Sequence, residues 1–280
     1  MPKAEINGIE IHYREWGEGY PVFLLHGFTG NLRSWALQIP ALTREFRTVS
    51  IDHRGHGHSQ KPTRPEDYSL EQMLEDAYGL LEHLGIKECY VVGHSMGGMV
   101  AQHLVLAHPE PVRALVLVDT AADMPSSLRT QERARLVEIA REEGMEAVFE
   151  EQMRTNPMAD QLRSQPEILE NWRRQFLLTS REAYIYCAQA IANREPLLDQ
   201  LRAIHIPTLI ICGENDDPFL EPSHRMHERI PDSELVIIAG AGHTPQIEKP
   251  AEFNRTLTEF LARVHQGVAA GPKTQSWVRQ

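Results

Sequence analysis

One serine in the sequence lies where a reactive serine would need to be. Residues Gly93–Gly97 read GHSMG, with Ser95 at the centre. A strand-like apolar run, Cys89–Val92, leads into this segment, and a helix-like segment follows from Met96. Such a strand–turn–helix unit holds the serine in a tight, strained turn, where the helix N-terminus favours negative charge. We therefore expect Ser95 to act as a nucleophile.

A serine hydroxyl is a weak nucleophile and requires a base that accepts its proton. Among the 14 histidines, His243 is the best placed, because it follows the last apolar run and precedes the last helix-like segment. Asp216 follows the preceding run and is the preferred carboxylate to orient the imidazole. Asp217 is its neighbour and Asp119 ends a run at the same expected edge, so both remain alternative acids.

The oxygen that becomes negative when a serine attacks a carbonyl requires two N–H donors. The amide of Met96, directly after the serine, is one candidate. The amide of Phe28 is the other, because it lies in the HGF turn after the strand-like run Val22–Leu25. We expect both amides at the edge of the sheet that holds Ser95.

The segments that position these residues are short and rich in Val, Ile and Leu. They are nearly continuous rather than alternating, which is typical of parallel strands covered by helices on both faces. An alternating segment around Asn7 and Gly8 predicts a hairpin at the sheet edge. Helix-like segments separate the runs, which indicates an α/β protein with right-handed crossovers. The runs are Pro21–Gly27, Arg47–Asp52, Cys89–Ser95, Arg113–Asp119, Pro207–Gly213 and Glu234–Gly240.

Residues 122–201 interrupt this alternation with a charged, helix-patterned stretch that has no strand-like run. We interpret this stretch as a helical cap between two parts of a core, residues 1–121 and 202–266, with a flexible tail at 267–280. Four aromatic side chains are candidates to line an apolar substrate pocket under the cap. Ordinary core packing explains them equally well: Trp35, Trp172, Phe176 and Tyr184.

The composition argues against several classes of function. A net charge of −11, with no stripe of Lys or Arg, argues against nucleic-acid binding. No stretch is apolar enough to span a bilayer and no signal peptide pattern opens the chain, so we expect a cytoplasmic protein. The histidines of Asp52–Ser59 lack the spacing of a zinc site, and no Walker loop or GxGxxG is present. We therefore expect no metal and no organic cofactor. Of the three cysteines, Cys89 and Cys212 lie in or beside apolar runs, so we expect buried thiols there.

Taken together, these motifs resemble the α/β-hydrolase superfamily, in the order in which that superfamily carries them. The resemblance implies an eight-stranded, mostly parallel sheet with a helical cap inserted after the sixth strand. It also implies the triad of Ser95, Asp216 and His243 and the N–H donors proposed above. A serine at position 95 argues against haloalkane dehalogenases and epoxide hydrolases, which use an aspartate there. The matching segments are HGF at Gly27, DHRGHGHS at Asp52–Ser59, GHSMGG at Gly93–Gly98, GENDDP at Gly213–Pro218 and GHTPQIEKP at Gly242–Pro250.

Within this superfamily, GHSMGGMVAQ looks like the corresponding segment of carboxylesterases, 3-oxoadipate enol-lactonases and carbon–carbon bond hydrolases, with cofactor-free perhydrolases as near cousins. We therefore expect a serine esterase that acts on a small-molecule ester through an acyl-enzyme. The alternatives are enol-lactone hydrolysis, carbon–carbon hydrolysis or perhydrolysis at the same triad, and a ligand-binding protein with a vestigial triad. A monomer or a small homo-oligomer is expected.

Overall fold

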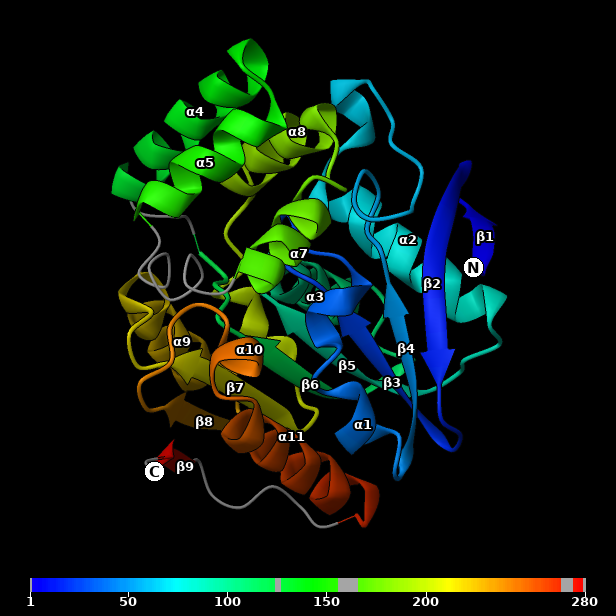
Figure 1. The fold of residues 1–280 in the computed structure, drawn as a ribbon. Helices are drawn as coiled ribbons and strands as arrows, with labels where there is room; N and C mark the ends of the chain where they lie inside the picture. The colour runs from blue at the N-terminus through cyan, green and yellow to red at the C-terminus, as the bar shows by residue number, and fades with distance from the viewer. Residues whose placement is uncertain (1, 124–126, 156–165, 268–273, 279–280) are drawn as a thin grey trace.

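A mixed sheet of nine strands forms the centre of the molecule (Figure 1). The computed structural model describes residues 2–123, 127–155, 166–267 and 274–278. The strands are β1 Lys3–Ile6, β2 Ile9–Trp16, β3 Tyr20–Leu25, β4 Phe46–Ile51, β5 Cys89–His94, β6 Val112–Val118, β7 Thr208–Gly213, β8 Ser233–Ile238 and β9 Thr274–Val278. Their order is β1-β2-β4-β3-β5-β6-β7-β8-β9. The β1–β2 and β2–β4 pairs are antiparallel, and the other neighbours are parallel.

Helices cover both faces of this sheet. The apolar sides of α2, α3 and α9 pack on one face, and those of α1 and α11 pack on the other. Short helical turns, η1 to η3, lie in the connections. The bounds are η1 Leu32–Trp35, α1 Ile39–Leu42, η2 Pro65–Asp67, α2 Leu70–His83, α3 Met96–Ala107, η3 Gln200–Ala203, α9 Asp217–Arg229, α10 Pro245–Glu248 and α11 Pro250–His265. This two-sided cover confirms the predicted α/β architecture.

The continuous apolar runs follow from this two-sided burial. In β3, Phe23 and Leu25 join the core under α2 and α3, whereas Val22 and Leu24 join the core under α1 and α11. All four side chains are fully buried. Successive side chains of a strand point to opposite faces, so a strand covered on both faces needs apolar residues at every position.

The cap predicted for residues 122–201 contains only helices among its described residues. Its helices are α4 Ser127–Glu142, α5 Met145–Thr155, α7 Pro166–Phe176 and α8 Arg181–Ala192, which fall between β6 and β7. They lie beyond the ends of the parallel strands (Figure 1). Two contacts join them to loops that follow strands: the Ser180 amide donates to the Gly55 carbonyl at 3.0 Å, and the ring centroids of Tyr184 and Phe28 are 4.9 Å apart. Residues 124–126 and 156–165 of the predicted cap lie outside the described ranges.

The eight strands expected from the sequence are present as β1 to β8, and the sheet gains one more strand from the end of the chain. The flexible tail predicted for residues 267–280 is wrong at Thr274–Val278, which form β9 and pair in parallel with β8. These residues have no apolar run of their own, so it is the open edge of β8 that supplies the hydrogen bonds. None of the described helices combines the length and the apolar composition needed to cross a bilayer.

Candidate active site

Ser95 lies between β5 and α3 in a strained backbone conformation. Its φ is 52° and its ψ is −115°, a region that residues other than glycine rarely adopt. The Ser95 carbonyl accepts hydrogen bonds from the Thr120 hydroxyl at 2.7 Å and from the Met99 amide at 3.1 Å. At Gly97, a Cβ atom would lie 2.3 Å from the Leu25 carbonyl oxygen, so only glycine lets α3 approach the end of β3 this closely. These contacts hold the strained turn in place.

His243 connects Ser95 to a buried carboxylate. The His243 Nε2 atom is 3.1 Å from the Ser95 Oγ atom, and the His243 Nδ1 atom is 2.7 Å from Asp216 Oδ2. The Phe219 ring stacks on the imidazole, with the ring centroids 4.8 Å apart. Because Asp216 accepts the Nδ1–H, the Nε2 atom is left to accept the serine proton. The structure therefore brings together Ser95, Asp216 and His243.

The two alternative acids occupy different positions. Asp217 is exposed at the first position of α9. Asp119 is fully buried, has a φ of 43°, and accepts the Gly213 N–H at 2.9 Å. A carboxylate oxygen of Asp119, one of Asp216 and the Cys212 sulfur all lie within 4.8 Å of one another. Asp119 is thus a neighbour of Asp216, and it is Asp216 that binds the imidazole.

The two buried carboxyl groups influence each other. Burial, followed by the negative charge of Asp216, raises the pKa of Asp119 well above its usual range. Two carboxylates this close cannot both ionise at low cost. Burial also raises the pKa of the Cys212 thiol. By spacing alone these three described residues could ligate a metal ion. The raised pKa values of Asp119 and Cys212 oppose the deprotonation that metal ligation requires.

The two predicted N–H donors lie beside the serine. At Gly27, the residue before Phe28, a Cβ atom would be 3.2 Å from Ser95 Cβ, so this turn directly contacts the serine. Met96 is the first residue of α3, where an amide has no partner within its own helix. Across the described part of the chain, no hydrogen-bond acceptor is found for either amide. Both are therefore free to bind a negative oxygen at Ser95.

Two of the four predicted pocket residues lie near these donors. Tyr184 is buried and its ring packs beside that of Phe28. Phe176 is also buried, and its ring centroid is 6.4 Å from that of Tyr184. Both belong to the apolar cluster inside the cap, and Phe28 packs against this cluster.

The two tryptophans lie elsewhere. Trp172 is 38% exposed and its ring meets that of Phe149 edge-on, with the ring centroids 6.3 Å apart. Trp35 is fully buried and packs against Phe253 in the core under α1 and α11. The prediction of Trp35 as a pocket residue is therefore wrong, because η1 directs this side chain into the core of the sheet. Its aromatic character fits either location, and the sequence contains no signal that separates the two.

Hydrogen bonds and an ion pair hold the loop after β4. Asp52 accepts the amides of Leu32 at 2.7 Å and His58 at 2.8 Å. Arg54 forms a bidentate ion pair with buried Asp76, in which its Nε and Nη2 atoms lie 2.7 and 2.8 Å from the carboxylate oxygens. Cys89, Cys187 and Cys212 are free and buried, which confirms the prediction of buried thiols at Cys89 and Cys212.

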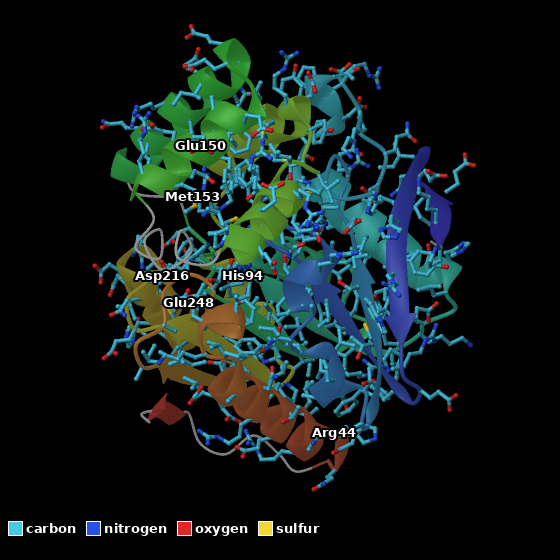
Figure 2. The ribbon with its side chains drawn as sticks, viewed as in Figure 1. Arg44, His94, Glu150, Met153, Asp216 and Glu248 are labelled. Atoms are coloured by element: carbon cyan, nitrogen blue, oxygen red, sulfur yellow. The ribbon has the colours of Figure 1, made fainter. Side chains whose placement is uncertain are left out.

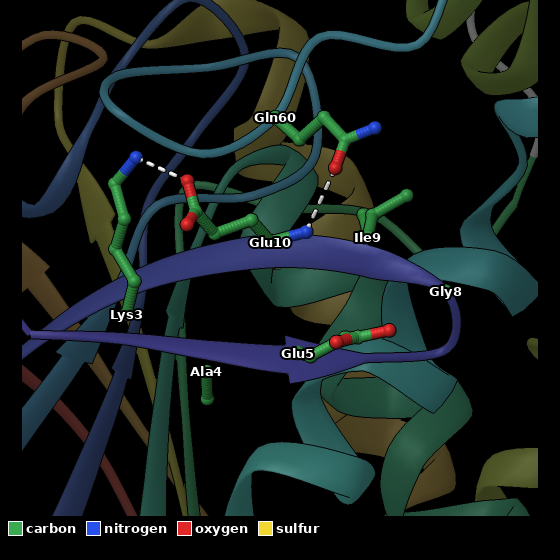
Figure 3. Close-up of a pocket in the computed structure, with 7 residues that line it drawn as sticks. All are labelled: Lys3, Ala4, Glu5, Gly8, Ile9, Glu10 and Gln60. Atoms are coloured by element: carbon green, nitrogen blue, oxygen red, sulfur yellow. Dashed lines mark hydrogen bonds and ion pairs between the residues drawn. The ribbon is translucent and has the colours of Figure 1, made fainter.

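A surface cavity of about 200 Å³ lies beside the β1–β2 hairpin (Figure 3). Its polar groups bind one another: Lys3 pairs with Glu10, and the Glu10 amide donates to Gln60 Oε1 at 3.0 Å. No residue of the Ser95 site lines it.

Two side chains that the sequence analysis did not select contact the loop that carries His243. His94 donates its Nε2–H to the His243 carbonyl at 2.7 Å. Glu248 accepts the amides of Gly242 and Thr244 at 2.7 and 2.9 Å. Glu248 lies five residues after His243, at the end of α10. This spacing is the signal in the sequence that could have pointed to Glu248.

Comparison with known proteins places this arrangement in a family. The family model described as alpha/beta hydrolase fold matches residues 20–250. The chain belongs to the alpha/beta hydrolase fold family. This match spans strands β3 to β8 and all three residues of the Ser95 site, in agreement with the predicted resemblance.

This hydrolase is similar to several characterised relatives. The enol-lactonase from Burkholderia xenovorans LB400 is 31% identical with a TM-score of 0.85, over 93% of this chain and 100% of that one. A thermophilic esterase from Thermogutta terrifontis is 32% identical with a TM-score of 0.85, over 95% and 100%. The 3-oxoadipate enol-lactonase 2 of Acinetobacter baylyi is 29% identical over 91% of this chain and 94% of its own length. The family and these relatives support a hydrolase that acts on small molecules.

Proposed function

We propose that this hydrolase cleaves carboxylic ester bonds of small to medium-sized molecules through an acyl-enzyme on Ser95. The observation that carries the proposal is the continuous chain of contacts from Ser95 Oγ to His243 at 3.1 Å and from His243 to Asp216 at 2.7 Å. A nucleophile, a base and an orienting acid in this geometry are the three parts that serine hydrolysis requires.

The first half of the reaction acylates the serine. Ser95 Oγ attacks the ester carbonyl carbon while His243 Nε2 takes the hydroxyl proton. The amides of Phe28 and Met96 donate to the carbonyl oxygen as it becomes negative. When this intermediate collapses, the bond to the leaving oxygen breaks and His243 gives its proton to that oxygen, which releases an alcohol. Asp216 stabilises the imidazolium throughout.

The second half restores the enzyme. A water molecule gives a proton to His243 Nε2 and its oxygen attacks the acyl-enzyme carbonyl. Collapse of this second intermediate breaks the bond to Ser95 Oγ, returns the proton to the serine and releases a carboxylic acid. The apolar part of the substrate packs against Phe28, Tyr184 and Phe176, which gather where the cap meets the site.

Turnover of p-nitrophenyl esters from acetate to palmitate, by the wild type and by Ser95→Ala, tests the proposal. We expect p-nitrophenol release that Ser95→Ala reduces by several orders of magnitude while it folds normally. The preferred chain length measures the space under the cap. A folded wild type that turns over none of these esters would contradict esterase function.

A second candidate is hydrolysis of an enol-lactone, because two of the similar proteins described above are enol-lactonases. A lactone is a cyclic ester, so the same steps open its ring and the alcohol stays attached to the acid. Comparison of kcat/KM for an enol-lactone and for linear esters separates the two candidates. Turnover of vinylogous diketones tests the carbon–carbon hydrolase alternative, and acyl transfer to peroxide tests the perhydrolase alternative. Tight ligand binding without turnover would support the ligand-binding alternative.

A further inference from the structure

Glu248 binds the backbone on both sides of His243. One carboxylate oxygen accepts the Gly242 amide at 2.7 Å. The other accepts the Thr244 amide at 2.9 Å and the Thr244 hydroxyl at 2.8 Å. The Glu248 amide in turn donates to the Thr244 carbonyl at 2.9 Å, which closes a ring between the loop and α10. The Glu248 carboxylate thus accepts three hydrogen bonds from Gly242 and Thr244.

His94 binds the same loop from the sheet. It is the last residue of β5, its side chain is buried, and its Nε2–H donates to the His243 carbonyl at 2.7 Å. Burial and the neighbouring His243 lower the pKa of His94 to about 3, so its ring stays neutral with the proton on Nε2. Figure 2 shows His94, Asp216 and Glu248 gathered on adjoining elements at this end of the sheet.

Glu248 therefore binds the amides of residues 242 and 244, and His94 binds the carbonyl of residue 243. Each of these three successive residues has a side-chain partner on its backbone. This matters because the His243 side chain is 37% exposed, so packing alone does not hold it. Asp216 and Phe219 set how the ring is turned, but the position of the ring also depends on where the backbone of His243 lies. A shift of about 1 Å in a reacting group is enough to slow a reaction about a hundredfold.

We propose that Glu248 and His94 are positioning residues that clamp the backbone of residues 242–244 and so hold His243 at hydrogen-bond distance from Ser95. The inference rests on the proposed function, in which His243 is the base. Glu248 acts through the backbone of the loop, and His94 acts through the His243 carbonyl and through a ring contact with His243, with the ring centroids 5.1 Å apart. Together they preorganise the base before the substrate binds, so their removal affects the chemical step rather than substrate binding.

The chemistry of the clamp predicts which substitutions keep it. Glu248→Gln retains the size of the side chain but leaves one acceptor oxygen, and its NH₂ group faces an N–H donor. It should therefore lose most of the clamp. His94→Gln keeps an N–H donor near the position of the His94 Nε2 atom, whereas His94→Ala removes it.

The experiment measures kcat, KM and melting temperature on the best p-nitrophenyl ester. We expect Glu248→Gln to lower kcat about 10- to 100-fold with little change in KM. His94→Ala should lower kcat about tenfold, and His94→Gln should restore most of that loss. Glu214→Gln is the matched control, because Glu214 accepts the Gly240 amide at 2.8 Å in the same region but does not bind residues 242–244. It should stay within about twofold of the wild type.

Equal kinetics for Glu248→Gln and Glu214→Gln, or an effect on KM alone, would overturn the proposal. Amide hydrogen exchange gives a readout that is independent of turnover. We expect the Gly242 and Thr244 amides to be protected in the wild type and to exchange faster in Glu248→Gln. A wild type that turns over nothing would refute the proposed function but still allow this test. Unchanged exchange at both amides would then refute the clamp.

Discussion

At the scale of the residue, the most informative pair is Asp119 and Asp216. Both are buried, and both follow strands at the same edge of the sheet. Burial and the charge of Asp216 raise the pKa of Asp119, while Asp216 accepts the imidazole N–H. The two carboxyl groups therefore have separate tasks: Asp216 is the partner of His243, and Asp119 is a neighbour whose pKa is raised.

This division predicts different outcomes for the same substitution. Asp216→Asn places an N–H donor where an acceptor is needed and should lower kcat about 10⁴-fold, because the wrong tautomer of His243 is then favoured. Asp119→Asn resembles the neutral acid and should lower kcat less than about tenfold. Ester turnover of both variants is the measurement. Equal losses, or the reverse order, would show that Asp119 is the ionised acid.

The residues of the site were predictable to different degrees. Ser95 and His243 could be identified because each is fixed by a motif and by its place after a strand. Asp216 could be preferred over Asp119 but not established, because spacing along the chain does not reveal which carboxylate faces the imidazole. His94 has no comparable signal, because its bond to the His243 carbonyl joins residues that are distant in the chain. That geometry appears only in three dimensions.

At the scale of the element, the turn from β5 to α3 depends on its close contact with the end of β3. Gly97→Ala would put a methyl group 2.3 Å from the Leu25 carbonyl oxygen, and a backbone carbonyl in a sheet cannot move aside easily. We expect a loss of about 1–3 kcal/mol in the free energy of unfolding and a large loss of activity, as α3 shifts away from β3. Urea unfolding and ester turnover measure the two effects.

Gly79→Ala in α2 is a control for that substitution. Its added Cβ would meet the Ile6 Cγ2 methyl group at 2.7 Å and the Asn7 Nδ2 atom at 3.8 Å, which are side-chain atoms rather than backbone, and alanine is favoured over glycine in a helix by about 1 kcal/mol. This variant should lose less stability than Gly97→Ala and should keep its activity. If Gly79→Ala is as damaging as Gly97→Ala, the close approach of α3 to β3 is not the cause.

The elements with strong local signals were predictable. β3 to β8 follow from their apolar runs, and Ser69 is a serine directly before α2 that caps it by accepting the Gln72 amide at 3.1 Å. β9 was not predictable, because it depends on the distant edge of β8 rather than on its own sequence. The placement of Trp35 under α11 has the same origin: a long-range contact decides between two locations that suit the residue equally well.

At the scale of the whole molecule, buried imidazoles link stability to pH. His26, His53 and His56 are fully buried, and burial lowers the pKa of His53 to about 3 and of His56 to about 4. The pKa of His26 is also lowered by burial. In the unfolded chain each imidazole titrates near its ordinary pKa of about 6.5.

Between about pH 6.5 and pH 4 the unfolded chain therefore binds protons that the folded chain does not, so stability falls as the pH falls. Each imidazole contributes a slope of about 1.4 kcal/mol per pH unit in this window. We expect His53→Gln to reduce the slope by about that amount, as measured by urea unfolding at a series of pH values. Parallel curves for the variant and the wild type would contradict the role of His53.

The central claim is that Ser95 is a nucleophile activated by His243, and covalent trapping tests it most directly. A p-nitrophenyl phosphonate that attacks serine hydrolases is added to the wild type, to Ser95→Ala and to His243→Ala. We predict one equivalent of p-nitrophenol from the wild type, with the phosphonyl mass on the peptide that contains Ser95. We predict no label in Ser95→Ala and very slow labelling in His243→Ala. A label on another residue, or equal labelling of wild type and His243→Ala, would contradict the account.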